Sequence, residues 1–343
     1  MDTRAFITGV SGLTLTPDES AFLRAQGPWG FILFKRNVDS PSQVSQLVKE
    51  LRDCVGRPDA PVLIDQEGGR VQRLSPPHWP IYPPGAVFGR LYDADPELGL
   101  TAARLASALI AFDLTDLGIT VDCLPLADVP VAGADAVIGN RAYGTEPGKV
   151  AAIARAVTEG LAQGGVLPVL KHIPGHGRAT ADSHLRLPTV DTSAAELDRT
   201  DFAAFRPLAD LPMAMTAHVV FSAIDPAQPA TTSATMIERV IRDAIGFQGL
   251  LMSDDVSMNA LAGSIAERTR AIFTAGCDVV LHCNGKLDEM HEVAVETPML
   301  AGRALQRAEA ALAARRSPDV GFDRKAARVR LDDLVRRAGE MSA

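Results

Sequence analysis

Short apolar runs that alternate with amphipathic stretches constrain the fold of this chain more than any other feature of its sequence. Eight such runs recur along the 343 residues, at 5–10, 30–34, 60–66, 120–126, 165–170, 213–220, 249–255 and 278–284. The stretches between them have helical periodicity, and several begin at Ser, Thr or Asp and end at Gly, as helices commonly do. Apolar strands alternating with helices predict a parallel sheet that is buried on both faces.

Strand number and chain length together favour a closed sheet. Eight strand-helix units in 343 residues predict an α/β fold, a single (β/α)8 TIM barrel that spans residues 1–343 as one domain. A doubly wound open sheet is the alternative, but the GxGxxG motif expected of dinucleotide-binding sheets does not follow the first apolar run. From residue 286 onward, the Ala-, Arg- and Glu-rich sequence predicts helices that close the outer ring of the barrel.

Charge and composition exclude several classes of partner. The chain carries 34 basic and 42 acidic residues, a net charge of −8, without a basic run, so we expect neither nucleic acid nor a membrane surface as partner. The N-terminus lacks the features of a secretory signal, and no segment is expected to reach the length of a membrane span. A cytoplasmic location is therefore expected.

The four cysteines lack paired spacing and are predicted to be buried thiols rather than disulfides or zinc ligands.

Polar side chains stand at the carboxyl ends of the apolar runs. They are Asp65, Glu67, Asp122, Asp128, Lys171, His172, His218, Asp254, Asp255, His282 and Asn284. Any one of them alone is explained as a capping or ion-pairing group. In a parallel barrel, however, the carboxyl ends of the strands meet at one face, where the active sites of such barrels lie. Because unpaired buried charge costs several kcal/mol, their convergence predicts a functional site at that face.

The densest group of these residues is the segment 171–188, KHIPGHGRATADSHLRLP, which directly follows an apolar run. A helix does not continue through Pro174 and Gly175, so the segment is predicted to be an irregular loop. Loops of this kind, held by a rigid scaffold and rich in titratable groups, commonly carry catalytic residues. We therefore expect a catalytic loop here.

Five motifs resemble, in their order, the bacterial β-N-acetylhexosaminidases of glycoside hydrolase family 3, the NagZ-type enzymes. The motifs are LIDQEGGRVQRL, VIGNRAYG, KHIPGHGRATADSH, MTAHVVF and GFQGLLMSDDVSM. The resemblance covers residues 30–285 and implies a (β/α)8 barrel without a cofactor. It also implies a retaining β-N-acetylglucosaminidase that removes non-reducing terminal N-acetylglucosamine from small, soluble muropeptide fragments during peptidoglycan recycling.

The same resemblance implies roles for individual residues. Asp254 would be the nucleophile that forms a covalent glycosyl-enzyme, and Asp255 beside it would be structural. His184 would be the acid/base, oriented by Asp182 two residues earlier. An imidazole, with its ordinary pKa of about 6.5, is suited to proton transfer near neutral pH. The residues implied to bind the sugar are Asp65, Arg73, Arg141, Lys171 and His172.

Other positions of the motifs are expected to support the site. Glu67, Arg70 and His218 are candidates for contacts behind the substrate-binding residues, and His176 is expected to hold the loop in shape. Arg178 stands at a variable position of the loop, and the resemblance implies no role for it.

Three alternatives remain open at the level of the sequence. A metal-dependent barrel hydrolase could use the cluster His172, His176 and His184 with Asp182 as ligands, although Pro174 and Gly175 break the helical spacing of a zinc motif. A non-catalytic sugar-binding barrel is the second alternative. The third is a phosphorylase, because an uncharged His acid/base would let phosphate approach in place of water. The sequence makes no prediction of the oligomeric state.

Overall fold

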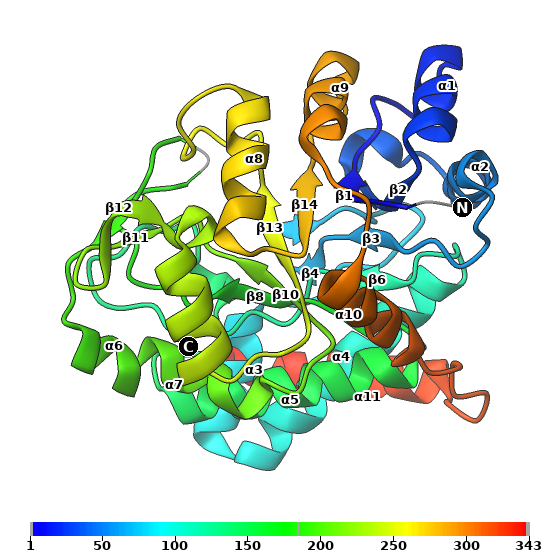
Figure 1. The fold of residues 1–343 in the computed structure, drawn as a ribbon. Helices are drawn as coiled ribbons and strands as arrows, with labels where there is room; N and C mark the ends of the chain where they lie inside the picture. Colours follow the sequence, from blue (N-terminus) through cyan, green and yellow to red (C-terminus); the bar gives the residue numbers. More distant parts are fainter. Residues whose placement is uncertain (1–2, 184, 341–343) are drawn as a thin grey trace.

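The computed structural model describes residues 3–183 and 185–340, and within them a curved, nine-stranded parallel sheet forms the centre of the fold (Figure 1). Its strand order is β7-β6-β3-β2-β1-β14-β13-β10-β8. The strands are β1 (Arg4–Thr8), β2 (Pro28–Leu33), β3 (Val62–Ile64), β6 (Val121–Asp122), β7 (Leu167–Pro168), β8 (Leu170–Ile173), β10 (Met213–Thr216), β13 (Leu250–Asp255) and β14 (Val279–His282).

The two ends of this strand order belong to one stretch of chain. Only Val169 separates β7, which pairs with β6, from β8, which pairs with β10. The amide of Ala127 also donates to the carbonyl of Lys171, which continues the pairing beyond β6. The sheet therefore curls into a barrel, and its strands coincide with the eight predicted apolar runs.

Helices follow the strands, and most of them cover the outside of the sheet, as the alternating pattern predicts. They are α1 (Pro17–Gln26), α2 (Pro41–Val55), α3 (Gly85–Ala94), α4 (Pro96–Thr115), α5 (Pro147–Gln163), α6 (Ala194–Arg199), α7 (Asp201–Phe205), the π-helix η5 (Met236–Ala244), α8 (Ile265–Ala275), α9 (Leu287–Glu296), α10 (Gly302–Ala313) and α11 (Arg324–Glu340). This arrangement is consistent with a (β/α)8 barrel and not with an open, doubly wound sheet.

The helix ends have the chemistry that their sequences predict. Ser264 accepts a hydrogen bond from the amide of Glu267, and the carboxylate of Glu267 accepts one from the amide of Ser264, so α8 begins with a capping box. At its other end Gly276 has a φ of 108°, a conformation that costs a glycine little. Helix α8 therefore begins and ends at residues with the cap chemistry that the sequence predicts.

The last helices do not all belong to the outer ring. Ala308 and Ala311 of α10 are buried in the cluster of side chains that fills the inside of the barrel. This cluster also contains Ile7, Ile32, Leu63, Val121, Val169, Met213, Met215, Leu250, Met252 and Val279. The prediction that everything after residue 286 closes the ring was therefore wrong for α10. Its small, apolar face fits against the barrel interior, a contact that helical periodicity does not distinguish from ring packing.

One expectation from composition was also wrong. The helix α4 has 20 residues and is apolar enough to span a membrane by length and composition alone. It packs against α3, α5 and α11 (Figure 1), and 61% of its most apolar window is buried inside the protein. A core helix of this kind meets the same criterion. Three of the four cysteines lie as predicted: Cys54, Cys123 and Cys277 are buried free thiols, whereas Cys283 is a free thiol that is partly exposed.

Two small sheets shape the loops at the carboxyl ends of the barrel strands. β4 (Gln66–Gly68) and β5 (Val71–Gln72) form a hairpin after β3, and β9 (Thr189–Val190) pairs with β11 (Val220–Phe221), which also pairs with β12 (Asp225–Pro229). The buried side chain of Gln66 accepts hydrogen bonds from the amides of Arg73 and Leu74. The hairpin is thereby fixed beside the strand end that carries Asp65.

Candidate active site

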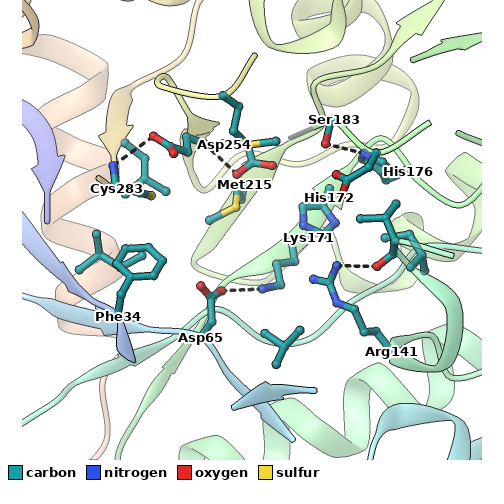
Figure 2. A pocket seen from close by; sticks show the side chains of 18 of the residues that line it. Phe34, Asp65, Arg141, Lys171, His172, His176, Ser183, Met215, Asp254 and Cys283 are labelled. Atoms are coloured by element: carbon teal, nitrogen blue, oxygen red, sulfur yellow. Dashed lines mark hydrogen bonds and ion pairs between the residues drawn. The ribbon is translucent and has the colours of Figure 1, made fainter. Parts of the chain in front are cut away.

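A cavity of about 270 Å³ opens at the carboxyl ends of the barrel strands, where the sequence predicts the site (Figure 2). All the predicted site residues within the described part of the chain line it. These residues are Asp65, Arg73, Arg141, Lys171, His172, Asp182 and Asp254. They come from loops and strand ends far apart in the sequence, so the tertiary fold brings them together.

A network of buried charges forms the floor of this cavity. Lys171 Nζ lies 2.9 Å from Asp65 Oδ1 and 2.7 Å from Glu67 Oε1, so one ammonium group bridges two carboxylates. Arg73 Nη2 makes a second contact with Asp65 at 3.0 Å. Arg141 donates to Glu67 from Nε and Nη2, at 2.8 and 2.7 Å, in the two-point geometry that arginine and carboxylate favour.

This pairing keeps the carboxylates ionised in spite of their burial. Burial by itself would raise the pKa of Asp65, but Lys171 and Arg73 outweigh it and hold that pKa below its usual range. The pKa of Glu67 is lowered too, because Lys171 and Arg141 outweigh the effect of burial. Burial would lower the pKa of Lys171, whereas its two carboxylate partners raise it. The floor therefore presents fixed charges at neutral pH.

A second buried network supports His172 and the loop that follows it. His172 Nδ1 donates to Asp128 Oδ2 at 2.8 Å, and Asp128 Oδ1 accepts from the amide of His176 at 2.7 Å. Burial opposes ionisation of Asp128, but His172 and His176 outweigh it and lower its pKa to about 2. His176 Nε2 lies 3.0 Å from Ser183 Oγ. The expectation that His176 holds the loop through hydrogen bonds agrees with these contacts.

Asp254 lies across the cavity from the charged floor, at the end of β13 (Figure 2). Its Oδ1 accepts a hydrogen bond from the amide of Asp255 at 2.8 Å. The neighbouring Asp255 accepts from Ser257, through both the amide and the hydroxyl, and from the amide of Cys283. Because these contacts tie its carboxylate to the backbone, Asp255 has the structural surroundings that the sequence predicts for it.

His218 supports this strand end from behind. Its Nε2 donates to the carbonyl of Asp255 at 2.9 Å, and its Nδ1 lies 2.7 Å from Thr231 Oγ1. Several other predicted polar residues likewise do not line the cavity. They are Glu67, Asp122, Asp128, His282 and Asn284.

The predicted acid/base pair is only partly described. Asp182 lines the cavity. His184 lies outside the described residues, so its distance to Asp182 and to Asp254 stays a prediction.

Apolar and sulfur-containing side chains complete the cavity wall, and the sequence reasoning missed them. They are Ile32, Phe34, Val71, Val137, Ile138, Met215, Met258, Leu281 and Cys283. Phe34 has the guanidinium groups of Arg36 and Arg73 over its ring, at 4.9 and 5.3 Å from the ring centre. Its position just after β2 is the signal that could have identified it. The cavity thus combines charged and apolar side chains, and Phe34 lies beside the charged floor through its contact with Arg73.

The described residues contain no group of three His, Cys, Asp or Glu side chains arranged to hold a metal ion. His172 Nδ1 is already engaged by Asp128, and the rings of His172 and His176 are 5.7 Å apart between centroids. The third His of the alternative metal cluster, His184, lies outside the described residues. This part of the site therefore lends no support to a metal centre.

Comparison with known proteins agrees with the sequence resemblance. Residues 15–329 match the family model described as glycosyl hydrolase family 3 N terminal domain. A β-hexosaminidase of Alkalilimnicola ehrlichii is 39% identical over 280 residues, which cover 80% of this chain and 79% of that protein. NagZ from Neisseria gonorrhoeae in complex with N-trifluoroacetyl-D-glucosamine superposes with a TM-score of 0.87 at 32% identity, covering 98% of this chain and 99% of that one.

A second structure of the N. gonorrhoeae protein was determined in complex with a zinc ion. It superposes with a TM-score of 0.85 at 31% identity, and the match covers 98% of this chain and 99% of that chain. The family model and the relatives match most of the chain, and the residues matched by the family model include every motif that carries the resemblance. The chain therefore belongs to glycosyl hydrolase family 3, as a β-hexosaminidase of the NagZ type.

Proposed function

We propose that this protein is a retaining β-N-acetylglucosaminidase in which Asp254 is the nucleophile and His184, oriented by Asp182, is the acid/base. The observation that carries the proposal is the placement of the Asp254 carboxylate opposite a charged, hydroxyl-binding floor in one cavity. A carboxylate on one side of a sugar and a proton donor on the other are what a two-step displacement requires.

In the first step, an oxygen of Asp254 forms a bond to the anomeric carbon while the glycosidic bond breaks. The leaving oxygen takes the proton from His184. In the second step, a water molecule gives a proton to His184 as its oxygen attacks the anomeric carbon, and Asp254 leaves as a carboxylate. The hydrogen bond from the Asp255 amide favours the ionised form of Asp254 before attack and after release.

The floor residues are suited to bind sugar hydroxyls. Lys171, Arg73 and Arg141 donate hydrogen bonds, whereas Asp65 accepts them. Because these groups are already paired and held by burial, little reorganisation is needed when a substrate enters. The apolar side chains of the lining are suited to contact the apolar parts of the ring and its substituent.

The cavity volume supports a small substrate. About 270 Å³ lies just below the roughly 300–1,000 Å³ found for ligand sites, which suits one terminal sugar rather than a polysaccharide chain. We propose soluble muropeptide fragments with a non-reducing N-acetylglucosamine as the physiological substrate, in cytoplasmic peptidoglycan recycling. The NagZ relationship supports this choice.

The test is release of the aryl group from aryl β-N-acetylglucosaminides by the purified protein, with and without a chelator. We expect turnover that resists the chelator. Turnover that is lost when the chelator removes metal would favour the metal-dependent alternative instead.

Asp254→Asn, which conserves the size of the side chain, should abolish turnover while the unfolding transition is retained. Product analysis with and without phosphate separates hydrolysis from phosphorolysis.

The acid/base assignment needs a separate comparison. His184→Ala should slow substrates with poor leaving groups by about 10²–10⁴-fold, and slow activated aryl substrates far less, because only the former need a proton. Equal losses for both kinds of substrate would overturn the role of His184.

A further inference from the structure

Arg178 connects the catalytic loop to the outer helices through buried contacts. Its Nε donates to Asp201 Oδ2 at 2.6 Å, and its Nη2 donates to Thr200 Oγ1 at 3.0 Å and lies 3.1 Å from Glu196 Oε1. The Asp201 side chain is 1% exposed and that of Arg178 is 13% exposed. The contacts join the loop to the end of α6 and the start of α7.

The loop before Arg178 is fixed by close backbone packing. A Cβ on Gly177 would lie 2.1 Å from the carbonyl oxygen of Val129, so only glycine fits there. A Cβ on Gly175, whose φ is 137°, would lie 3.3 Å from Cβ of Asp201. Asp201 therefore lies close to the loop at two points: its side chain is near the backbone of Gly175, and its carboxylate accepts a hydrogen bond from Arg178.

The loop after Arg178 leads directly into the proposed acid/base. The amide of Asp135 donates to the carbonyl of Ala179 at 2.8 Å, and Ser183 contacts His176. Asp182 lines the cavity four residues after Arg178. Arg178, whose guanidinium contacts Asp201 at the start of α7, therefore lies at the start of the stretch that carries Asp182.

We propose that Arg178 is a positioning residue: by fixing the loop to α7 it sets the position of Asp182 in the cavity, and through Asp182 it affects the proposed acid/base. This inference rests on the proposed function, since it concerns the same acid/base. Burial of Asp201 supports the inference: among the described residues, the other carboxylate oxygen, Oδ1, has no hydrogen-bond partner. Removal of Arg178 would leave this carboxylate uncompensated and favour movement of the loop away from α7.

The test compares Arg178→Ala and Arg178→Lys with the unaltered protein on aryl β-N-acetylglucosaminides of good and poor leaving groups. We expect Arg178→Ala to lower kcat for poor leaving groups by about 10- to 100-fold, part of the general-acid contribution, with a loss below about threefold for activated ones. KM should change little, because the sugar-binding floor is unaltered. Arg178→Lys should restore part of kcat by restoring the charge beside Asp201.

The matched control is Arg206→Ala. Arg206 pairs with Asp198 of α6 and donates to the carbonyl of Ala244 at 3.0 Å, so it is another ion-pairing arginine of the same helical layer. It should not show a leaving-group dependence. A loss in Arg178→Ala that is equal for both kinds of substrate, or is reproduced by Arg206→Ala, would overturn the inference.

Asp201→Asn provides a second variant if Arg178→Ala does not fold, because it keeps the side-chain size and removes the charge. It should show the same leaving-group dependence, and its absence in a folded Asp201→Asn would count against the inference. If His184→Ala itself lacks that dependence, the proposed function fails. If His184→Ala shows it and the Arg178 and Asp201 variants do not, only the role of Arg178 fails.

Discussion

At the scale of single residues, the site depends on charges that are buried together. Lys171 is 1% exposed and neutralises two carboxylates that would otherwise be costly to bury. His176 is also buried, but its Nδ1 has no hydrogen-bond partner within residues 3–183 and 185–340. Burial and the neighbouring His172 lower its pKa to about 4. Acid should therefore act differently on the two positions. The stability lost on removing the charge of Lys171 should shrink as pH falls, whereas buried His176 should itself destabilise the folded protein as pH falls.

Lys171→Met keeps the length of the side chain and removes its charge. We expect a loss of about 3–5 kcal/mol in the free energy of unfolding at pH 7, because Asp65 and Glu67 lose their shared cation. Without it the pKa of each carboxyl rises in the folded protein, so the loss should shrink as pH falls and these groups take up protons. Urea unfolding at pH 7 and pH 5 measures both effects.

The control for Lys171 is Lys49→Met, which removes an exposed lysine from its pair with Asp53 and should not change stability measurably. A loss for Lys171→Met that is the same at both pH values would contradict the account of the buried carboxylates.

The pKa of His176 makes a separate prediction. The unfolded chain binds a proton near pH 6.5, and the folded chain only near pH 4. Stability from this residue is therefore complete above pH 6.5 and decreases as pH falls towards 4, by about 3 kcal/mol. His176→Gln should remove this part of the pH dependence in urea unfolding. His78→Gln, at an exposed position, should leave it unchanged, and an unaltered profile in His176→Gln would contradict the prediction.

At the scale of elements, α10 is a helix that packs against the side chains inside the barrel. Its buried residues Ala308 and Ala311 join the inner cluster rather than the layer between sheet and outer helices. Larger side chains would not fit a barrel interior that the strand residues already fill. Helix α10 therefore packs against the barrel interior, and only small residues fit at its buried positions.

Ala308→Asp should test this packing. It would place a carboxylate among apolar side chains, and we expect a loss of about 3 kcal/mol or more in the free energy of unfolding. Ala310→Asp is the matched control on the exposed side of the same helix and should be nearly neutral. Similar losses for the two variants, measured by urea unfolding, would show that α10 does not enter the barrel core.

At the scale of the whole molecule, chemistry and stability are placed on different parts of the barrel. The cavity lies at the carboxyl ends of the strands, whereas α11 packs on the outside against α3 and α4 (Figure 1). Leu331 and Leu334 of α11 are buried there. Contacts that hold the chain together at this surface do not touch the substrate site.

Leu331→Ala should therefore lower the free energy of unfolding by about 2–5 kcal/mol, through lost packing and the cavity it leaves. Its kcat/KM, measured at a temperature where the variant is folded, should stay close to that of the unaltered protein. A parallel fall in kcat/KM would mean that this surface is coupled to the site.

The strand ends show what could be read from the sequence and what could not. Asp65, Lys171 and Asp254 were identifiable because each follows an apolar run, and in a parallel barrel such positions share one face. The eight runs were identifiable for a similar reason, since period and helix-end chemistry are local properties. Partners across the chain, such as Glu67 with Arg141, depend on distances that no local pattern encodes.

The sequence by itself determined the alternation of strands and helices, the family and the loop that carries the site, because these depend on residue order and local preference. Only the tertiary structure decided that α10 enters the barrel, that α4 is a core helix, and that Arg178 reaches Asp201. An amphipathic or apolar helix can bury its apolar face against many different surfaces. Which surface it meets depends on the volume and charge left by the rest of the chain.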